Sequence, residues 1–587
     1  MGLSFTVASA EQQACVILRL DGGRYLLDEK GEETDSVWRR ESLPQVDIPI
    51  TVSNGKAEFI SDLEQYGMPG LRLFVRVSGG QGKNQLTVCV INSIEDDGSL
   101  DFQARNEHCL FQSQMTIYVG EDTEFVPRRA TGTGKEKDDR LNSLLYRETK
   151  EFATGHTCSA MWDEEQVAPQ WISTTWVPVQ KVDDVDPNGD PLLKQRLSER
   201  GFSGYSAEDM HTLDDPELFN LLETLPAVYS DWLEQERASS NGLDADHKKI
   251  ADGQFDEAKS VIERMNSSIE CLKKDKRALK AFRLANKAMQ RQMHWQGFDL
   301  VWRPFQIGFA LLTLRSLVMR DQDRDIMDLL WFPTGGGKTE AYLLLMAFVL
   351  FFRRLERGSL AKDDGVCVVT RYTLRALTTD QFERTVSMIC ACELIRRESD
   401  KNATDVKSFS LALWIGSGST PNTYADAKAS LNGTFGATPS VIEACPLCRN
   451  SLVWSADDTK EEIHCRCSSS DCEIADKLDY LPIHTVDEQI YRHHPSIVIG
   501  TVDKFAQVCR FPLRTNGLFN IGSDYLPPDL IVQDELHLIS GPLGTTTGLM
   551  ELAIDWLCSS ENKRPKIIGS TATIQSCLLY TSPSPRD

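Results

Sequence analysis

The stretch that decides the fold is residues 326–352, IMDLLWFPTGGGKTEAYLLLMAFVLFF. A short apolar run, Ile326–Phe332, leads into the glycine turn Pro333–Thr339, and a second apolar run, Ala341–Phe352, follows. Backbone N–H groups of such a turn, at the start of a helix, bind phosphate, while the lysine neutralises charge and the threonine hydroxyl ligates Mg²⁺. The stretch therefore predicts an α/β nucleotide-binding fold built from a strand, a phosphate loop and a buried helix.

The loop supplies the residues that we expect to bind the nucleotide. These are Thr334, Gly335, Gly336, Gly337, Lys338 and Thr339, and Thr339 is also expected to hold Mg²⁺. The strict pattern has a glycine where this chain has Phe332, which indicates a subclass of phosphate loops. Residues 131–135, TGTGK, look similar, but Glu136 replaces the hydroxyl residue and no apolar strand precedes them. They predict an ordinary loop.

A pair of carboxylates supplies the second half of the predicted site. Asp534 and Glu535 follow the apolar residues 530–532, and His537 completes the sequence DELH. A carboxylate at a strand end can hold Mg²⁺, and its neighbour can polarise the attacking water. An Asp-Glu pair taken alone is more often part of a solvated surface. Here the phosphate loop upstream and the sequence STAT at 570–573 favour the catalytic interpretation.

Cysteines gather in a short segment, about residues 441–475, downstream of the phosphate loop. A C-x₂-C knuckle followed by a second thiol pair about 20 residues on has zinc-ribbon spacing. We predict that one zinc ion is bound, with residues 451–463 as the hairpin, by Cys445, Cys448, Cys467 and Cys472. Cys465 or His464 is the alternative ligand. A redox role is the competing interpretation, but no thioredoxin-like pattern surrounds the knuckle. A structural role is expected, and the acidic segment gives no support to a DNA contact.

The pattern along the chain predicts a multidomain α+β protein. Short β-type runs separated by glycine turns predict a β-rich N-terminal module over residues 1–125. Residues 126–205 are a mixed connecting region, and charges and leucines at helical spacing predict a helical region over 206–297. From residue 298 to 576, strands, glycine turns and helices alternate, which is the α/β signature, with the zinc ribbon inserted at 441–475.

The composition narrows the class of protein. A chain of 587 residues, with 41% hydrophobic and 25% charged residues, is typical of a soluble globular protein of several domains. Its net charge of −23 excludes nucleic-acid binding by bulk charge, so such binding needs a local basic groove. The N-terminus lacks the pattern of a secretory signal, and the apolar run at 341–352 is too short to cross a membrane. We therefore expect a cytoplasmic protein with reduced cysteines and no membrane partner.

The motifs stand in the order found in superfamily 2 helicases of the DExH kind, which the chain resembles from about Val301 to Ile574. Arg303–Gln306 resembles their adenine-reading motif, residues 370–375 their motif Ia, and residues 500–505 their motif Ib. The phrases FPTGGGKTEAYL, RYTLRALTTDQFER, GTVDKFA and QDELHLISGPLG resemble the large helicase of the DISARM phage-defence system and its bacterial relatives. LLYRETKEFATGH and AFRLANKAMQRQ extend this resemblance toward the N-terminus.

The resemblance implies a RecA-like P-loop lobe and ATP hydrolysis that is stimulated by nucleic acid and coupled to translocation or remodelling. Gln306 would contact the adenine, Lys338 and Thr339 the phosphates and Mg²⁺, Asp534 the Mg²⁺, and Glu535 would orient the attacking water. Coupling to the nucleic acid is expected of His537, Ser570, Thr571, Ala572 and Thr573. Contact with the phosphodiester backbone is expected of Arg371, Arg375, Thr378 and Thr501. For the two arginines, a solvated helix edge is the alternative.

The sequence segments that resemble the defence helicases favour DNA over RNA as the nucleic acid. They also favour a protein partner from the same defence system. The ATPase motifs contact the backbone of the nucleic acid rather than its sugar, so they do not distinguish DNA from RNA. A DExH RNA helicase is therefore an alternative. A third hypothesis is an interaction protein whose N-terminal parts dock a partner while the ATP site regulates docking.

The last residues, 577–587, CLLYTSPSPRD, resemble a translated sequencing adapter, so we expect a longer natural chain. In this superfamily a second RecA-like lobe supplies an arginine finger, and the loss of such a finger costs about 10³–10⁵ in rate. We expect residues 1–576 to bind ATP weakly and to hydrolyse it very slowly.

Overall fold

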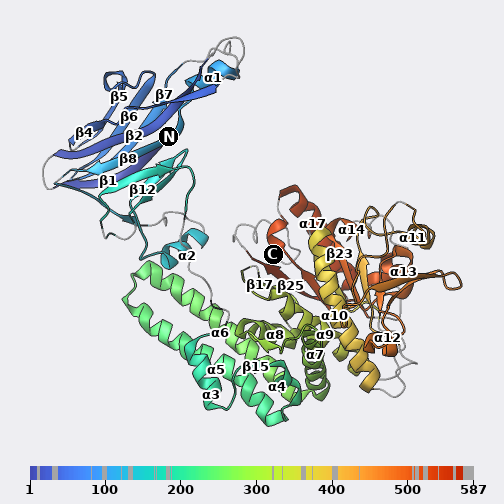
Figure 1. Ribbon diagram of the computed structural model, residues 1–587. Helices are drawn as coiled ribbons and strands as arrows, with labels where there is room; N and C mark the ends of the chain where they lie inside the picture. The colour runs from blue at the N-terminus through green and yellow to red at the C-terminus, as the bar shows by residue number, and fades with distance from the viewer. Residues whose placement is uncertain are drawn as a thin grey trace. The chain divides into compact units, whose positions relative to one another are not determined.

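The structure is a computed structural model of the chain. It describes residues 1–572 except for residues 10–12, 29–36, 54, 81, 95–101, 121, 130–136, 164–165, 167, 180–185, 187, 320–322, 334, 358–364, 373–374, 400–406, 435, 506–507, 509–514, 520–525, 540 and 560–563. The chain divides into two compact units (Figure 1), the first made of residues 1–184 and 244–250 and the second of the remainder.

The first unit is a β-sandwich of two antiparallel sheets. One sheet has the order β12-β1-β7-β6-β5, with β9 also paired to β1. Its strands are β1 (Gly2–Ser9), β5 (Ala57–Asp62), β6 (Leu71–Gly80), β7 (Lys83–Asn92), β9 (Thr123–Phe125) and β12 (Ala153–His156). The other sheet has the order β13-β14-β8-β2-β3, with β4 also paired to β2. Its strands are β2 (Gln13–Asp28), β3 (Val37–Ser42), β4 (Asp47–Ser53), β8 (Phe111–Val119), β13 (Ser159–Trp162) and β14 (Trp171–Thr175).

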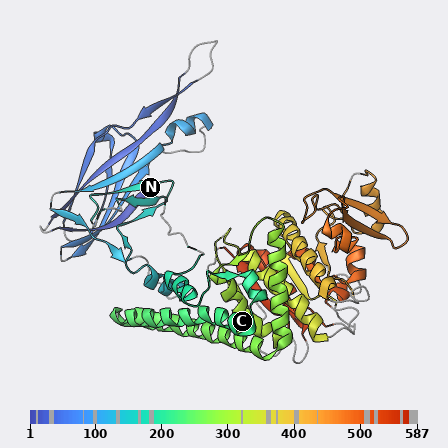
Figure 2. The ribbon, with the colours of Figure 1, turned by 60° about the horizontal axis from the view of Figure 1, so that its bottom comes forward.

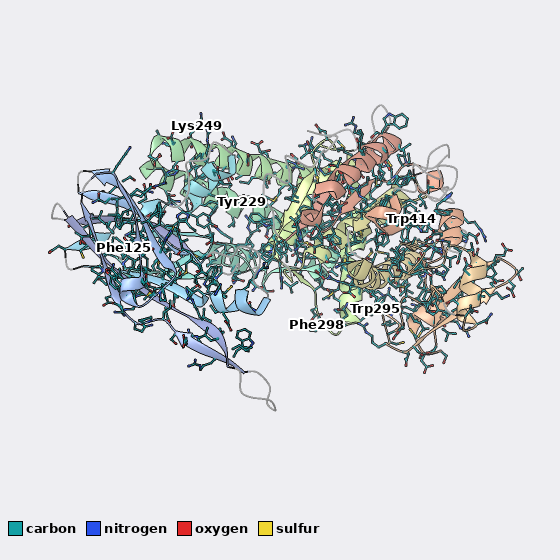
Figure 3. All side chains as sticks on the ribbon, turned by 90° about the horizontal axis from the view of Figure 1, so that it is seen from above. Phe125, Tyr229, Lys249, Trp295, Phe298 and Trp414 are labelled. Atoms are coloured by element: carbon teal, nitrogen blue, oxygen red, sulfur yellow. The ribbon has the colours of Figure 1, made fainter. Side chains whose placement is uncertain are left out.

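Alternation along the strands explains the sandwich. Leu3, Phe5 and Val7 of β1 are buried together with Val16 and Leu18 of β2 in one core. Because side chains of alternate residues point to one face of a strand, two such sheets can bury their apolar faces against each other. Figure 3 shows Phe125 among these side chains. The smaller elements of this unit are α1 (Phe102–His108), α2 (Lys137–Leu145), β10 (Arg128–Arg129) and β11 (Lys150–Glu151).

The sandwich extends beyond residue 125, where we placed the end of the β-rich module. Ala153 of β12 pairs with Phe5, and Ile172 of β14 pairs with Ile117 of β8. These late strands are only four or five residues long. An alternation that short is hard to distinguish from loop sequence, which is why the segment resembles a mixed connection.

Helices begin the second unit. They are α3 (Pro191–Glu199), α4 (Ala207–Thr212), α5 (Asp215–Ser239), α6 (Ala245–Lys274) and α7 (Lys276–His294). Figure 2 shows α5 and α6 side by side. They run antiparallel, because Arg237 contacts Asp256 at 3.3 Å near one end and Lys273 contacts Glu223 at 2.6 Å near the other. A short antiparallel pair of strands, β15 (Tyr205–Ser206) and β16 (Val301–Trp302), brings the beginning and the end of this region together.

A parallel sheet forms the centre of the second unit. Its order is β17-β25-β24-β18-β23-β19-β22. The strands are β17 (Asp328–Trp331), β18 (Val368–Tyr372), β19 (Leu411–Trp414), β22 (Ile483–His484), β23 (Ile497–Thr501), β24 (Leu530–Gln533) and β25 (Lys566–Thr571). The helices around it are α8 (Pro304–Val318), α9 (Lys338–Arg357), α10 (Arg375–Ser399), α11 (Tyr424–Leu431), α13 (Asp487–His493), α14 (Val502–Phe505) and α17 (Gly541–Cys558). The predicted combination of a β-rich module, helices and an α/β lobe is confirmed.

Both faces of the parallel sheet are covered. Val368 and Val532 face a core shared with α7, α8, α9 and α10, whereas Val369 and Ile531 face a second core shared with α13 and α17. Trp414, labelled in Figure 3, is fully buried in this second core. The apolar run at 341–352 lies within α9 and is buried. Within the described ranges, none of the helices is both long and apolar enough to span a membrane.

A buried carboxylate joins the helical region to the sheet. Asp328, at the start of β17, accepts hydrogen bonds from both terminal nitrogens of Arg264 on α6, at 2.8 and 2.7 Å. The ammonium of Lys566, at the start of β25, lies 2.8 Å from the same carboxylate. Two cations from separate elements thus share one anion, and removing Asp328 would take the common carboxylate away from both of them.

The half-buried imidazole of His484 on β22, whose Nδ1 is shielded from solvent, makes the stability of this unit depend on pH. Burial, and then the nearby His493, Lys407 and His464, lower its pKa to about 3. Below pH 6.5 the unfolded chain takes up a proton that the folded chain refuses, so the free energy of unfolding falls as the pH drops from 6.5 toward 3. Between pH 7 and pH 5 this group contributes a loss of roughly 2 kcal/mol.

We expect the variant His484→Phe, which keeps an aromatic ring and removes the titration, to lose correspondingly less stability over that interval. Urea unfolding of wild type and variant at pH 7 and pH 5 measures the difference. Equal losses in the two proteins would show that His484 titrates normally in the folded chain.

Candidate nucleotide site and zinc ribbon

The phosphate loop leaves β17 and enters α9 in the conformation that its glycines allow. Gly335 and Gly337 have φ angles of 78° and 90°, which disfavour any residue with a Cβ atom. A Cβ on Gly336 would lie 2.3 Å from the ring of Phe332. The phenylalanine that replaces the usual first glycine therefore packs on the loop itself. Thr334 lies outside the described residues.

Lys338 is the first residue of α9, and its ammonium group folds back over the loop. It donates to the backbone oxygens of Phe332 at 2.7 Å and Pro333 at 3.3 Å. Burial lowers the pKa of Lys338, and the carboxylates of Glu535 and Asp534 act in the opposite direction. The lysine therefore stands between the loop and the carboxylate pair, as a phosphate-binding cation should.

Residues at the start of α8 hold the phosphate loop in place by hydrogen bonds and ring stacking. Gln306 is buried, donates from its amide to the Gly337 backbone oxygen at 2.7 Å, and accepts from the Arg303 backbone N–H at 2.8 Å. The Arg303 guanidinium also donates to the Gly336 backbone oxygen. Phe305 stacks on Phe332 with 4.0 Å between ring centroids. In this structure Gln306 positions the loop, and its contact with adenine stays a prediction.

The carboxylate pair follows β24, the second neighbour of β17 in the sheet. Asp534 is buried, and its Oδ1 accepts the backbone N–H of Glu535 at 2.9 Å. Glu535 itself has φ 49° and ψ 47°, a left-handed conformation that is uncommon for a non-glycine residue. Burial, followed by repulsion from Asp534, raises the pKa of Glu535. A carboxylate whose pKa is raised toward neutrality is a better proton acceptor, which suits a general base.

The histidine of DELH reaches the neighbouring strand. His537 Nδ1 lies 2.9 Å from the Thr571 hydroxyl at the end of β25 and 3.3 Å from a Glu535 carboxylate oxygen. Ser570 is buried beside Thr571, and the Ala572 backbone oxygen accepts from the Trp331 indole at 3.1 Å. The DELH and STA residues are thus in contact, while Thr573 lies outside the described residues.

A tyrosine that the sequence analysis missed lies at the centre of the site. The fully buried Tyr342, one turn into α9, has its phenol oxygen 2.9 Å from Asp534 Oδ2 and 3.1 Å from the Thr339 hydroxyl. It also lies 3.2 Å from Gln381 Oε1 and 3.4 Å from the Tyr372 hydroxyl. Its position in an apolar helical run makes it look like ordinary core, and only the fold brings it against the carboxylate.

Two of the four side chains predicted to contact the nucleic acid lie in the described part of the chain, and both are buried. Arg371 is the next-to-last residue of β18 and Thr501 is the last residue of β23, and both are buried there. Arg371 pairs with Glu551 of α17 at 2.8 Å. It is therefore engaged within the protein in this structure. The side chains of Arg375 and Thr378 lie outside the described residues.

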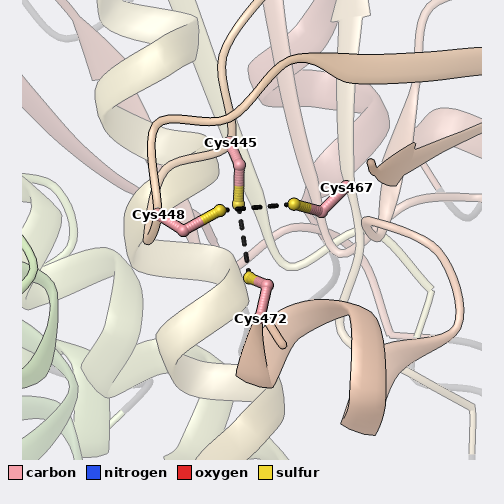
Figure 4. Close-up of side chains that lie close together, drawn as sticks. All are labelled: Cys445, Cys448, Cys467 and Cys472. Carbon is pink, nitrogen blue, oxygen red and sulfur yellow. Dashed lines mark hydrogen bonds between the residues drawn. The ribbon is translucent and has the colours of Figure 1, made fainter. Parts of the chain in front are cut away.

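The four cysteines favoured as zinc ligands come together (Figure 4). The sulfur atoms of Cys445, Cys448, Cys467 and Cys472 all lie within 4.8 Å of one another, with 3.7 Å between Cys445 and Cys472 and 3.3 Å between Cys448 and Cys467. A tetrahedral zinc site with Zn–S bonds of about 2.3 Å puts its sulfurs about 3.8 Å apart. The cluster is compatible with zinc.

The alternative ligands are directed elsewhere. Cys465 is buried outside the cluster, and the ring of His464 stacks on Tyr480 with 4.3 Å between centroids. The supporting hairpin is formed by β20 (Leu452–Asp457) and β21 (Glu462–Cys467), and the helix α12 (Glu473–Leu478) follows Cys472. The hairpin therefore extends four residues further than predicted, to the third cysteine.

The ribbon is fixed to the lobe by charge and packing. Arg291 of α7 contacts both Glu473 of α12, at 2.7 Å, and Glu398 of α10, at 3.0 Å. Cys445, Cys467 and Cys472 belong to the same core as α9 and α10. A rigid attachment of this kind favours a structural role for the cluster.

The parallel sheet, the phosphate loop after β17 and the carboxylate pair after β24 define a RecA-like P-loop lobe. No family model matches the chain. Among curated proteins, the chain is similar to DISARM protein DrmA of Bacillus paralicheniformis, with 31% identity over 553 residues that cover 80% of this chain and 48% of that protein. This similarity confirms the resemblance that the motifs predict. The chain spans about half the length of this curated relative.

Several solved helicase structures also show similarity to part of the chain. DUF1998 helicase MrfA has 14% identity and a TM-score of 0.28, and covers 51% of this chain and 31% of its own. Mycobacterium smegmatis helicase Lhr, bound to ssDNA and AMP-PNP, has 13% identity and a TM-score of 0.27, with 49% of this chain and 25% of its own covered. Mss116p, bound to ssRNA and AMP-PNP, has 13% identity and a TM-score of 0.28, with 51% and 39% covered.

Proposed function

We propose that this chain carries the first RecA-like lobe of an ATP-dependent nucleic-acid helicase or translocase that acts in the cytoplasm in anti-phage defence. One observation carries the proposal: Lys338 and Thr339 of the phosphate loop face Asp534 and Glu535 at the carboxyl edge of one parallel sheet. The similarity to DISARM protein DrmA supports the defence role and a protein partner from the same system.

Each residue has a distinct part in the proposed chemistry. The loop N–H groups and Lys338 bind the phosphates of ATP, and Thr339 and Asp534 hold Mg²⁺, which would neutralise charge on the β- and γ-phosphates. Glu535, with its raised pKa, orients and deprotonates the attacking water. His537, in contact with Thr571, transmits the state of the carboxylate pair to β25.

Zinc is proposed as a second, structural cofactor. Cys445, Cys448, Cys467 and Cys472 would bind it as thiolates, closing the tetrahedral site without an open position for chemistry. The ion would hold the hairpin and α12 against α10.

We propose DNA as the nucleic acid, supported by the phrases shared with the DISARM helicases. ATP turnover should rise several-fold more with a single-stranded DNA oligomer than with RNA of matched sequence, measured against Lys338→Ala as background. Greater stimulation by RNA would favour the DExH RNA helicase instead. If a protein partner is captured in a nucleotide-dependent way and neither oligomer changes this capture, the hypothesis of an interaction protein is favoured.

A further inference from the structure

The buried phenol of Tyr342 lies between the two residues proposed to hold Mg²⁺. Its oxygen is 3.1 Å from the Thr339 hydroxyl and 2.9 Å from Asp534 Oδ2, and the side chain is fully buried. No other described side chain has hydrogen bonds to both residues. The tyrosine therefore connects the phosphate loop to the carboxylate pair across the sheet edge.

The chemistry of the partners decides which way the hydrogen bonds run. A phenol donates one proton and accepts others, and a carboxylate can only accept. The phenolic proton therefore goes to Asp534 Oδ2, because the contact is the shortest of the four and a charged acceptor makes the stronger hydrogen bond. The Thr339 oxygen, 3.1 Å from the phenol oxygen, is then held beside Tyr342 without receiving that proton.

This polarity leaves the right atoms for a cation. Because the phenolic proton goes to Asp534, the Thr339 oxygen keeps its lone pairs for a metal, which is what a hydroxyl ligand requires. Asp534 is held at Oδ2 by Tyr342 and at Oδ1 by the Glu535 backbone N–H, so its carboxylate plane is fixed. Residues that orient metal ligands commonly affect metal affinity about 10- to 100-fold.

We propose that Tyr342 is a positioning residue for Mg²⁺, orienting Thr339 and Asp534 toward the cation of a bound Mg²⁺-nucleotide. This inference rests on the proposed function and adds a residue to its site. Tyr342 acts through the two ligands and touches neither nucleotide nor water in this role.

The test uses Tyr342→Phe, which removes only the hydroxyl, and Tyr372→Phe as a matched control. Tyr372 is an equally buried tyrosine that hydrogen-bonds to Tyr342, and the described contacts give it none to Thr339 or Asp534. A fluorescent, non-hydrolysable ATP analogue is titrated in EDTA, and Mg²⁺ is then titrated at a fixed analogue concentration. Thermal unfolding of each variant is measured in parallel.

We expect Tyr342→Phe to raise the Mg²⁺ concentration for half-maximal response about tenfold, with affinity for the analogue in EDTA unchanged. Tyr372→Phe should respond to Mg²⁺ as wild type does. An unchanged Mg²⁺ response in Tyr342→Phe would overturn the inference, and so would loss of cooperative unfolding in that variant alone, since the hydroxyl would then serve folding.

Failure of the proposed function has a different signature. If wild type binds the analogue no better than Lys338→Ala does, the nucleotide site is wrong and the inference falls with it. If wild type binds and responds to Mg²⁺ but Tyr342→Phe behaves identically, only the inference is wrong.

Discussion

Replacing Lys338 by alanine is expected to weaken binding of a Mg²⁺-ATP analogue about 100-fold, because a charge-assisted contact to phosphate is lost from a partly desolvated site. The ammonium lies over the loop on the carbonyls of Phe332 and Pro333, with Asp534 and Glu535 nearby. Competition of the analogue against a fluorescent nucleotide measures the effect. Lys338 begins α9 without closing a buried ion pair, so the variant should unfold at a similar temperature.

The chain offers a matched control in its second T-G-x-G-K sequence. The variant Lys135→Ala removes a lysine from TGTGK at residues 131–135, which we predict to be an ordinary loop. It should bind the analogue as wild type does. Equal weakening by both variants would mean that lysine charge, rather than the phosphate loop, accounts for binding.

Loss of one zinc ligand is the second large effect that we expect. The variant Cys472→Ser should reduce the bound zinc from about one ion per chain to nearly none and lower the free energy of unfolding by on the order of 5 kcal/mol, since structural zinc sites contribute their binding energy to folding. Cys472 is the N-cap residue of α12 and is part of the core shared with α9 and α10. Metal analysis of the purified protein and urea unfolding measure the two quantities.

Cys465→Ser is the matched control for this prediction. Cys465 is as buried as Cys472 but lies outside the cluster. Its replacement should leave the zinc content unchanged, with a smaller loss of stability. Loss of zinc from Cys465→Ser with retention in Cys472→Ser would exchange the two residues as ligands.

Much of the α/β lobe could be predicted because its signals are local. The glycine turn between two apolar runs specifies strand, loop and helix within 27 residues, 326–352. The cysteine spacing is similarly local, since a knuckle and a hairpin bring Cys445, Cys448 and Cys467 to one place. Cys472 reaches the cluster from the segment between β21 and α12.

What the sequence did not reveal depends on contacts between distant elements. Tyr342 has no local mark that separates it from its apolar neighbours, and only the order of strands in the sheet brings Asp534 to it. The sequence gives no sign that Arg371 is buried, because its partner Glu551 lies far along the chain. The two cations that contact Asp328 could not be predicted either, because Arg264 and Lys566 are far from it in the sequence.

Photolabelling with an ATP analogue that carries its reactive group on the γ-phosphate tests the central claim most directly. Peptide mapping should find the label within residues 332–342 or 534–537, and excess unmodified ATP with Mg²⁺ should abolish it. Label that is concentrated elsewhere in the chain, or that ATP does not displace, would contradict the assignment of these residues as the nucleotide site.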